Sequence, residues 1–231
     1  MCKPGKLYGL GVGPGDPELM TLKSVRLIKE CDVIVIPCSG QSVNAAYTIA
    51  LGAVPEIKEK NIVEVDMPMI RDKAKLEQCH DKATEEIIKY LKNGKLVAFL
   101  TLGDPSIYST YIYVHDRILA KGYDAELVPG IPSFCAVAAR LNEGLTEASQ
   151  PLHIIPSSYK GLEDGLGLKG TKVLMKSGKS IGKIKKMIME DPSVTGKMVQ
   201  RCGMDGEQVF HHAKDISEDA SYFSIIVVKD K

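Results

Sequence analysis

Short apolar segments alternate along the chain with longer segments in which apolar residues recur at helical spacing. This alternation is typical of an α/β fold built on a largely parallel sheet. It predicts strands at 7–12, 33–36, 96–101 and 125–128, and helices at 17–30, 72–93 and 108–120. We therefore expect the N-terminal part of the chain to form a parallel sheet covered by helices.

Residues with strong positional preferences mark several of these boundaries. Asp16 and Pro17 suit the N-cap and the first position of the first helix. Pro37 is expected to end the second strand. Gly94 and Gly122 follow the next two helices, where glycine is the preferred residue just past a C-terminus. Local signals therefore agree with the hydrophobic pattern.

The pattern changes after segment 129–133, beyond which shorter strands are predicted at 153–155, 172–175, 198–201 and 222–228. We therefore expect an N-terminal α/β domain over residues 1–128 and a C-terminal α/β domain over residues 129–231. The stretch 160–170 holds four glycines and is expected to be a surface loop or a flap over a site. Residues 181–188 predict an amphipathic helix with its lysines in solvent.

Composition narrows the class of protein. Thirty basic and 29 acidic side chains leave a net charge of +1, so no global field attracts nucleic acid. The longest apolar runs are strand-sized, far below the roughly 20 residues that cross a bilayer. The six cysteines are scattered without a CxxC pair, and the N-terminus lacks the zones of a signal peptide. We expect a cytoplasmic protein that binds neither nucleic acid nor membrane.

Metal and acyl-transfer chemistry find no support in the sequence. The histidines and cysteines show no zinc-ligand spacing, and no serine lies in a GxSxG elbow. His211 and His212 are expected to be an exposed pair near a strand end. We therefore expect no protein-bound metal.

A glycine-rich segment at 9–17 begins within the first predicted strand and continues into the loop after it. A dinucleotide-binding GxGxxG motif would need glycine where Pro14 or Asp16 stands, and we expect no Gly-Lys-Ser or Gly-Lys-Thr of a phosphate-binding loop. Pyrophosphate binding is therefore not indicated. So many glycines bring the backbone close to a neighbour, which is either a ligand or another part of the protein. Both alternatives stay open.

Segment 102–105, Leu-Gly-Asp-Pro, begins where the buried strand 96–101 ends. In open parallel sheets, ligands bind outside the carboxyl ends of the strands. Asp104 either contributes to such a site or caps the next helix. The position favours a ligand-binding loop.

Segments 11–17, 103–110 and 128–133 occur in an order and at separations that resemble the tetrapyrrole (corrin/porphyrin) methylases over nearly the whole chain. Segments 109–115 and 129–142 are most similar to the branch that methylates precorrin-2 or cobalt-factor II at C-20. The resemblance implies an S-adenosylmethionine-dependent C-methyltransferase of cobalamin biosynthesis, with S-adenosylhomocysteine as product. It also implies two α/β domains, of which the second completes the cofactor cleft, and a homodimer.

The same resemblance implies a set of cofactor contacts in this sequence. They fall on Pro14, Leu102, Gly103, Asp104, Ile107, Pro132, Ser133, Met175, Lys176 and Gly203. No nucleophilic side chain is needed, because the tetrapyrrole carbon is itself the nucleophile. Asp16, Tyr108 and solvent are alternative acceptors for the proton that this carbon loses.

Other functions stay open at this point. A related methylase could act at another tetrapyrrole carbon or, more remotely, on a protein as the diphthine methylases do. A binding module could retain S-adenosylmethionine without turnover. No motif distinguishes a metal-free from a cobalt-containing substrate.

Overall fold

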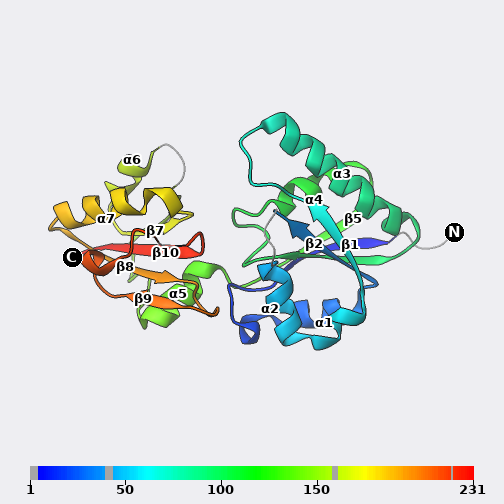
Figure 1. Cartoon of the computed structure of the whole chain (residues 1–231), viewed down its shortest axis with the longest axis horizontal. Helices are drawn as coiled ribbons and strands as arrows, with labels where there is room; N and C mark the ends of the chain where they lie inside the picture. The colour runs from blue at the N-terminus through cyan, green and yellow to red at the C-terminus, as the bar shows by residue number, and fades with distance from the viewer. Residues whose placement is uncertain (1–4, 40–43, 158–160, 220) are drawn as a thin grey trace. The chain divides into compact units, whose positions relative to one another are not determined.

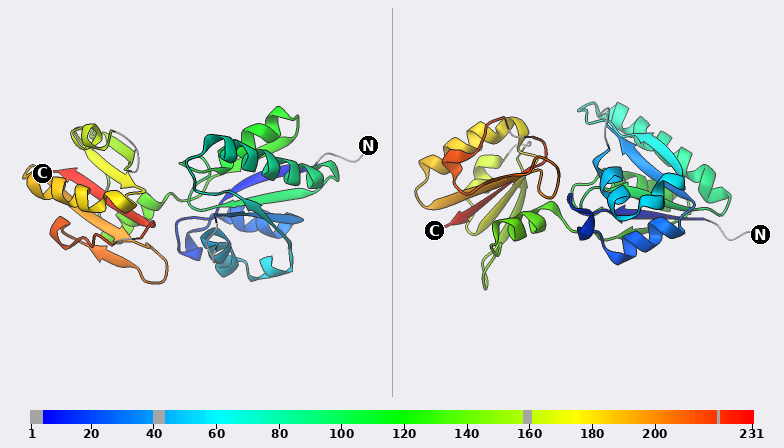
Figure 2. Two further views of the ribbon diagram at one scale, coloured as in Figure 1. Left: turned by 45° about the horizontal axis from the view of Figure 1, so that its top comes forward. Right: turned by 60° about the horizontal axis from the view of Figure 1, so that its bottom comes forward.

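The computed structural model of the chain describes residues 5–39, 44–157, 161–219 and 221–231. It divides into two compact units, Met1–Pro132 and Ser133–Lys231. Each unit contains its own five-stranded sheet (Figures 1 and 2). The division falls after Pro132, four residues beyond the boundary predicted after residue 128.

The first unit is built on a sheet in which every strand runs parallel to its neighbours, in the order β3-β2-β4-β1-β5. Its strands are β1 (Lys6–Gly11), β2 (Val33–Cys38), β3 (Asn61–Asp66), β4 (Leu96–Thr101) and β5 (Asp124–Val128). The parallel α/β fold predicted from the sequence is confirmed. Because the strands share one direction, all five carboxyl ends meet at one edge of the sheet.

Helices cover both faces of this sheet (Figure 1). They are α1 (Leu22–Glu30) and α2 (Ala45–Ala53) on one face, and α3 (Lys73–Lys92) and α4 (Tyr111–Ala120) on the other. Asp72 caps α3 by accepting a hydrogen bond from the Lys75 N–H (3.1 Å), and Gly94 follows with a φ of 71°. The predicted ends of the long helix are confirmed.

Several predicted boundaries in the first unit are wrong. The helix expected over 108–120 is α4, which begins only at Tyr111. The single helix expected over 17–30 is a short 3₁₀ turn, η1 (Pro17–Leu19), followed by α1, because Met20 and Thr21 have extended backbones and Thr21 caps α1. Strand β2 does not end at Pro37 but continues to Cys38. Strand β4 pairs with β2 only at residues 33–35, so the missing N–H of Pro37 breaks no hydrogen bond on that side.

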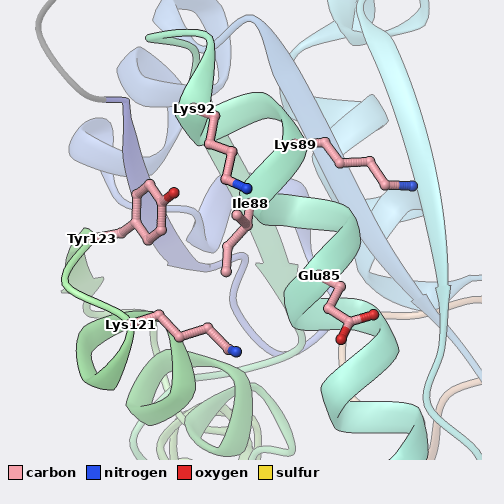
Figure 3. Close-up of a pocket in the computed structure, with 6 residues that line it drawn as sticks. All are labelled: Glu85, Ile88, Lys89, Lys92, Lys121 and Tyr123. Atoms are coloured by element: carbon pink, nitrogen blue, oxygen red, sulfur yellow. The ribbon is translucent and has the colours of Figure 1, made fainter.

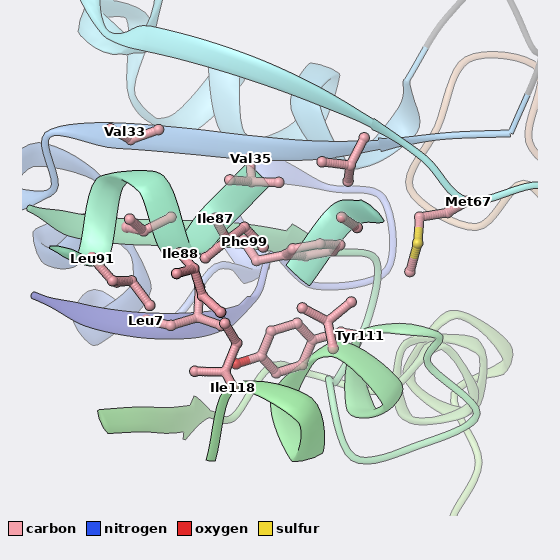
Figure 4. Close-up of a cluster of buried hydrophobic side chains, with 14 residues drawn as sticks. Leu7, Val33, Val35, Met67, Ile87, Ile88, Leu91, Phe99, Tyr111 and Ile118 are labelled. Carbon is pink, nitrogen blue, oxygen red and sulfur yellow. The ribbon is translucent and has the colours of Figure 1, made fainter. Parts of the chain in front are cut away.

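One hydrophobic core of the first unit lies between the sheet and the helices α3 and α4 (Figure 4). Its buried side chains come from strands and from both helices and include Leu7, Val35, Phe99, Ile87, Leu91, Tyr111 and Ile118. Full burial of one such side chain contributes roughly 1.5–3 kcal/mol. This packing anchors α4, and with it the loop that precedes α4, against the sheet.

The second unit has a mixed sheet in the order β6-β7-β10-β8-β9, with only β6 and β7 parallel neighbours. The strands are β6 (Leu152–Pro156), β7 (Thr171–Met175), β8 (Val194–Gln200), β9 (Gln208–Phe210) and β10 (Ser224–Asp230). Its longer helices are α5 (Ser133–Leu141) and α7 (Ile181–Glu190). The prediction missed β9, which has three residues and carries too little pattern to detect.

The glycine-rich stretch 160–170 is not simply a loop. Lys160 lies outside the described residues, but α6 (Leu162–Leu166) forms a short helix whose Leu162 is buried in the core of the second unit. Helix α7 is amphipathic as predicted, with Ile181, Ile184 and Ile188 buried. The turn η3 (Gly178–Ser180) contains Gly-Lys-Ser, but the glycine that a phosphate-binding loop needs five residues earlier is Val173.

His80 on α3 is a buried group with an unusual environment. Its ring is 4% exposed and stacks on Tyr113 of α4, with ring centroids 4.8 Å apart. Its Nδ1 is the only buried side-chain nitrogen or oxygen without a hydrogen-bond partner in the described part of the chain. Burial and the nearby Arg117 guanidinium lower the pKa of His80, whereas Glu77 and Asp81 oppose that shift. The folded protein therefore favours neutral His80.

We expect this histidine to make the protein acid-sensitive. The unfolded chain binds a proton at His80 more readily than the folded chain, so stability is full above about pH 6.5 and falls as pH decreases below it. His80→Phe keeps an aromatic ring against Tyr113 and removes the titration. In thermal melts, lowering the pH from neutral to mildly acidic should reduce the melting temperature less in this variant than in the unmodified protein. An equal reduction in both proteins would contradict the assignment.

Candidate functional site

Three loops leave the carboxyl ends of β1, β4 and β5, which are neighbours in the sheet. We call them loop 1 (residues 12–16, after β1), loop 2 (residues 102–110, after β4) and loop 3 (residues 129–132, after β5). They hold most of the three sequence segments that carry the family resemblance. The parallel sheet therefore brings those segments together at one edge.

Main-chain hydrogen bonds join loop 1 to loop 2. The Gly103 N–H donates to the Gly13 carbonyl at 2.8 Å, and the Gly13 N–H donates to the Gly103 carbonyl at 3.3 Å. The Val12 N–H donates to the Thr101 carbonyl at 2.9 Å. Pairing between the two chain segments thus continues past the ends of β1 and β4.

Glycine at positions 11 and 130 allows loop 3 to touch the other two chain segments. A Cβ on Gly11 would lie 2.5 Å from the Gly130 nitrogen and 2.7 Å from the Gly103 oxygen. A Cβ on Gly130 would lie 2.1 Å from the Gly103 oxygen and 2.8 Å from the Gly11 Cα. Any side chain at either position would force the backbones apart.

The structure shows which atoms lie against two glycines of the first glycine-rich segment. A Cβ on Gly9 would lie 2.0 Å from Cε1 of Tyr111, a fully buried residue of α4. Gly11 meets the backbones of Gly103 and Gly130. At these two positions the close neighbour is protein rather than ligand.

Gly103 differs from the other glycines at this junction. Its φ is 70°, in the left-handed region that favours glycine, and an added Cβ would meet only the Ile131 oxygen, at 3.9 Å. Space therefore remains beside the Gly103 Cα at the end of β4.

Both carboxylate oxygens of Asp104 are bonded within the protein. Oδ1 accepts hydrogen bonds from the Ser106 N–H (2.8 Å) and the Ser106 hydroxyl (2.5 Å). Oδ2 accepts a hydrogen bond from the Gly130 N–H at 2.9 Å. Asp104 does not cap α4, which begins later at Tyr111. It shapes loop 2 and ties it to loop 3.

Asp104→Asn is expected to lose the tie between the loops while keeping the turn. The amide oxygen of asparagine still accepts from Ser106, but its NH2 group then faces the Gly130 N–H. Two donors cannot hydrogen-bond to each other, and the lost hydrogen bond costs about 1–3 kcal/mol. For the S-adenosylhomocysteine that the resemblance implies as a ligand, we expect about tenfold weaker binding, since 1.4 kcal/mol is tenfold. Titration calorimetry measures it.

Asp191 offers a matched control for this substitution. It is also followed by proline and serine, and its Oδ1 accepts from the Ser193 N–H (2.9 Å) and hydroxyl (2.5 Å). No cross-loop hydrogen bond to Asp191 occurs in the described residues. Asp191→Asn should leave affinity unchanged, and equal effects of the two substitutions would contradict a specific role for the Gly130 contact.

Helix α1 and a short 3₁₀ turn also hold loop 1 in place. The fully buried Ser24 hydroxyl donates to the Gly11 carbonyl at 2.9 Å. Asp16 accepts a hydrogen bond from the Glu18 N–H at 2.9 Å and caps the 3₁₀ turn η1. The predicted cap at Asp16 is confirmed, although it caps η1 rather than a continuous helix.

Four other predicted residues also lie in loops 1 and 2. Pro14 is buried in loop 1, whereas Leu102 and Ile107 are partly exposed in loop 2. Tyr108 is 46% exposed and has a φ of 49°, a conformation that a residue with a side chain adopts at a cost. Such strain is common at functional sites.

Other predicted cofactor residues lie at loop 3 and in the second unit. Pro132 ends loop 3, and Ser133 begins α5. Met175 ends β7, and Lys176 follows it with a φ of 55°; burial lowers the pKa of the Lys176 ammonium. Gly203 follows β8 with a φ of 71°.

Strands β7 and β8 both run antiparallel to β10, so Met175, Lys176 and Gly203 follow strand ends at the same edge of the second sheet. The Gly203 N–H donates to Oε2 of Glu207 at 2.8 Å. A ligand at Gly203 would therefore contact another atom of this residue or displace Glu207 from its N–H.

Sequence reasoning missed three residues that shape the loops: Ser24, Tyr111 and Gly130. Gly130 lies in a segment that carries the resemblance, but its contact with Asp104 is 26 positions away in the chain. Ser24 and Tyr111 lie on helices and look like ordinary helix positions. Only the folded arrangement shows what they touch.

Within the described residues, His, Cys, Asp and Glu side chains form no group of three that could hold a metal ion. His211 and His212 are exposed, as predicted. The same residues include no helix that is both long and apolar enough to span a membrane.

The tetrapyrrole (corrin/porphyrin) methylase family matches residues 6–215. The chain belongs to this family. It is 35% identical to the probable cobalt-precorrin-2 C(20)-methyltransferase of Methanocaldococcus jannaschii, over 97% of this chain and 96% of the relative. It is 29% identical to the cobalt-precorrin-2 C(20)-methyltransferase of Salmonella typhimurium, over 97% and 96%.

Solved structures support the fold. A cobalt precorrin-4 methyltransferase superposes with a TM-score of 0.75 at 20% identity, over 97% of this chain and 94% of that one. The uroporphyrin-III C-methyltransferase of Thermus thermophilus, complexed with S-adenosylhomocysteine, superposes with a TM-score of 0.70 at 21% identity, over 97% of both chains.

Proposed function

We propose that this chain transfers a methyl group from S-adenosylmethionine to C-20 of precorrin-2 or its cobalt-containing form, a step of cobalamin biosynthesis. Full-length similarity to relatives named for this reaction carries the proposal. The space beside Gly103, at the edge where parallel sheets bind ligands, supports it.

S-adenosylmethionine supplies an electrophilic methyl group on a positively charged sulfur. Because that charge is lost as the methyl leaves, a carboxylate at the sulfur would stabilise the ground state more than the transition state. Asp104 bonds Ser106 and Gly130 instead. We therefore assign to loop 2 the role of orienting the cofactor through main-chain groups and shape, with Asp104 stabilising that loop.

The remaining cofactor contacts in the proposal rest on family resemblance. They are Pro14, Leu102, Ile107, Pro132, Ser133, Met175, Lys176 and Gly203. The proposal also includes a homodimer and a location in the reducing cytoplasm. The cytoplasmic location fits the five free cysteines among the described residues. Sedimentation analysis tests the dimer, and a monomer at working concentration would contradict it.

Asp16 and Tyr108 are the candidate proton acceptors in the proposal. Asp16→Asn preserves an oxygen that accepts from Glu18, so stability should change little, whereas Asp16→Ala should cost about 1 kcal/mol. If Asp16 takes the proton, Asn lowers turnover by about 100-fold because it cannot be protonated. We expect the cap to be the main role, with near-normal single-turnover rates for Asp16→Asn. A stable variant with collapsed turnover would assign the proton to Asp16.

Turnover with defined tetrapyrroles tests the function. The protein is incubated with S-adenosylmethionine and either precorrin-2 or cobalt-factor II, and S-adenosylhomocysteine is quantified. NMR of the product should place the new methyl group on C-20. Methylation elsewhere would assign a sibling activity, and cofactor binding without turnover on any tetrapyrrole would indicate a binding module. Cofactor binding should survive a chelator, since the proposal includes no protein-bound metal.

A further inference from the structure

A hollow of about 400 Å³ in the first unit lies away from the three loops (Figure 3). Its lining comes from α3, the end of α4 and the start of β5: Glu85, Ile88, Lys89, Lys92, Lys121 and Tyr123. Lys92 ends α3 shortly before β4, and Tyr123 directly precedes β5. The hollow therefore lies at the amino ends of strands whose carboxyl ends carry loops 2 and 3. A five-residue strand spans roughly 17 Å, so the two places are separate.

The lining carries an excess of positive charge, with three lysines against one glutamate. Lys89 forms an ion pair with Glu86. Lys92 and Lys121 have no acidic partner among the residues that the structure describes. Other lysines of this unit, such as Lys6 and Lys95, are ion-paired. The lining therefore holds two lysines that pair with no acidic side chain of the described residues, beside one glutamate.

The shape of the hollow suits a compact ligand. Figure 3 shows the Lys92 and Lys121 side chains extending toward the space beside Ile88, with the Tyr123 ring across from Ile88. Ile88 is 9% exposed and forms an apolar wall. The Tyr123 hydroxyl adds a hydrogen-bond donor. Two cations and a hydroxyl at the rim of an apolar wall can bind an anion of small size.

We propose that this hollow binds a compact phosphate-bearing anion, held by Lys92 and Lys121 and oriented by the Tyr123 hydroxyl. Lysine binds phosphate as a point charge, whereas arginine pairs with a carboxylate or a phosphate through two parallel hydrogen bonds. The lining contains lysines and no arginine. The proposal is independent of methyl transfer, because it uses none of the residues of the three loops.

A simpler role for these lysines makes a different prediction. Lys92 is the last residue of α3 and Lys121 is the C-cap of α4, where a cation offsets the helix dipole by typically 0.3–1 kcal/mol. That role requires no ligand. It predicts lower thermal stability on substitution but no saturable anion binding.

Calorimetry with inorganic pyrophosphate at low ionic strength tests the proposal. The variant Lys92→Gln/Lys121→Gln removes both cations, and Lys58→Gln/Lys73→Gln removes the same charge at exposed positions outside the hollow. We expect saturable binding to the unmodified protein, about tenfold weaker binding in the first variant and less than about twofold change in the second.

Absence of saturable binding, or equal weakening in both variants, would overturn the proposal. Tricarballylate, a compact polycarboxylate, should bind more weakly than pyrophosphate, and the reverse order would overturn the assignment to phosphate. S-adenosylhomocysteine affinity should be the same in all three proteins. If the unmodified protein binds pyrophosphate but not S-adenosylhomocysteine, the proposed methyl transfer fails while this site stands.

Discussion

Gly130→Ala is expected to weaken S-adenosylhomocysteine binding by about 100-fold, or roughly 2.8 kcal/mol, which lies within the usual cost of overpacking a close contact. The added Cβ would lie 2.1 Å from the Gly103 oxygen and 2.8 Å from the Gly11 Cα, both backbone atoms. Loop 3 must therefore move away from loop 2 and strain the hydrogen bond from Gly130 to Asp104. Overpacking of this kind also costs about 1–3 kcal/mol of stability.

Gly144→Ala is the matched control for this substitution. A Cβ there would meet only the Thr146 oxygen, at 3.7 Å, which is ordinary contact. Both variants are compared by calorimetric titration beside a thermal melt, so that a folding defect is separated from lost binding. A folded Gly130→Ala protein with unchanged affinity would show that the contact of the three loops does not shape the cofactor site.

Asp230→Ala is expected to lower the free energy of unfolding of the second unit by about 3–5 kcal/mol, the cost of leaving a buried charge unpaired. Lys172 of β7 is 1% exposed and forms an ion pair with Asp230 of β10, which is 41% exposed. The Lys172 ammonium also donates to the Leu168 carbonyl at 3.1 Å, and Asp230 accepts from the Gly170 N–H at 2.7 Å. Without Asp230, the Lys172 ammonium keeps only the Leu168 carbonyl as a partner among the described residues.

The reverse substitution is expected to cost less. Lys172→Met fills a similar volume with apolar atoms, and the partly exposed Asp230 left behind is solvated, so the loss should be about 1–2 kcal/mol. The double variant should be more stable than Asp230→Ala alone, because no buried charge remains. Denaturant unfolding followed by circular dichroism measures all three, and equal losses from the two single substitutions would contradict this account.

Elements with strong local signals could be predicted from the sequence. Helix α3 combines a regular apolar stripe with Asp72 before it and Gly94 after it, and β4 is a buried apolar run. Strand β3 and helix α2 were missed. Strand β3 lies at the edge of the sheet and fully buries only Val65, whereas α2 is apolar on nearly all sides, so neither shows a clear period. The break at Thr21 was also missed, because the apolar stripe continues across it.

The sequence by itself determined the parallel α/β class and the family, because periodicity, helix caps and the ordered set of three segments are local properties of the chain. It also placed Gly103 and Asp104 at the end of a strand. Only the tertiary structure decided what these residues do. Asp104 bonds Gly130, and Gly9 accommodates the Tyr111 ring, through contacts between segments far apart in the chain. A local pattern carries no information about such neighbours, since the adjacency of β4, β1 and β5 in the sheet creates them.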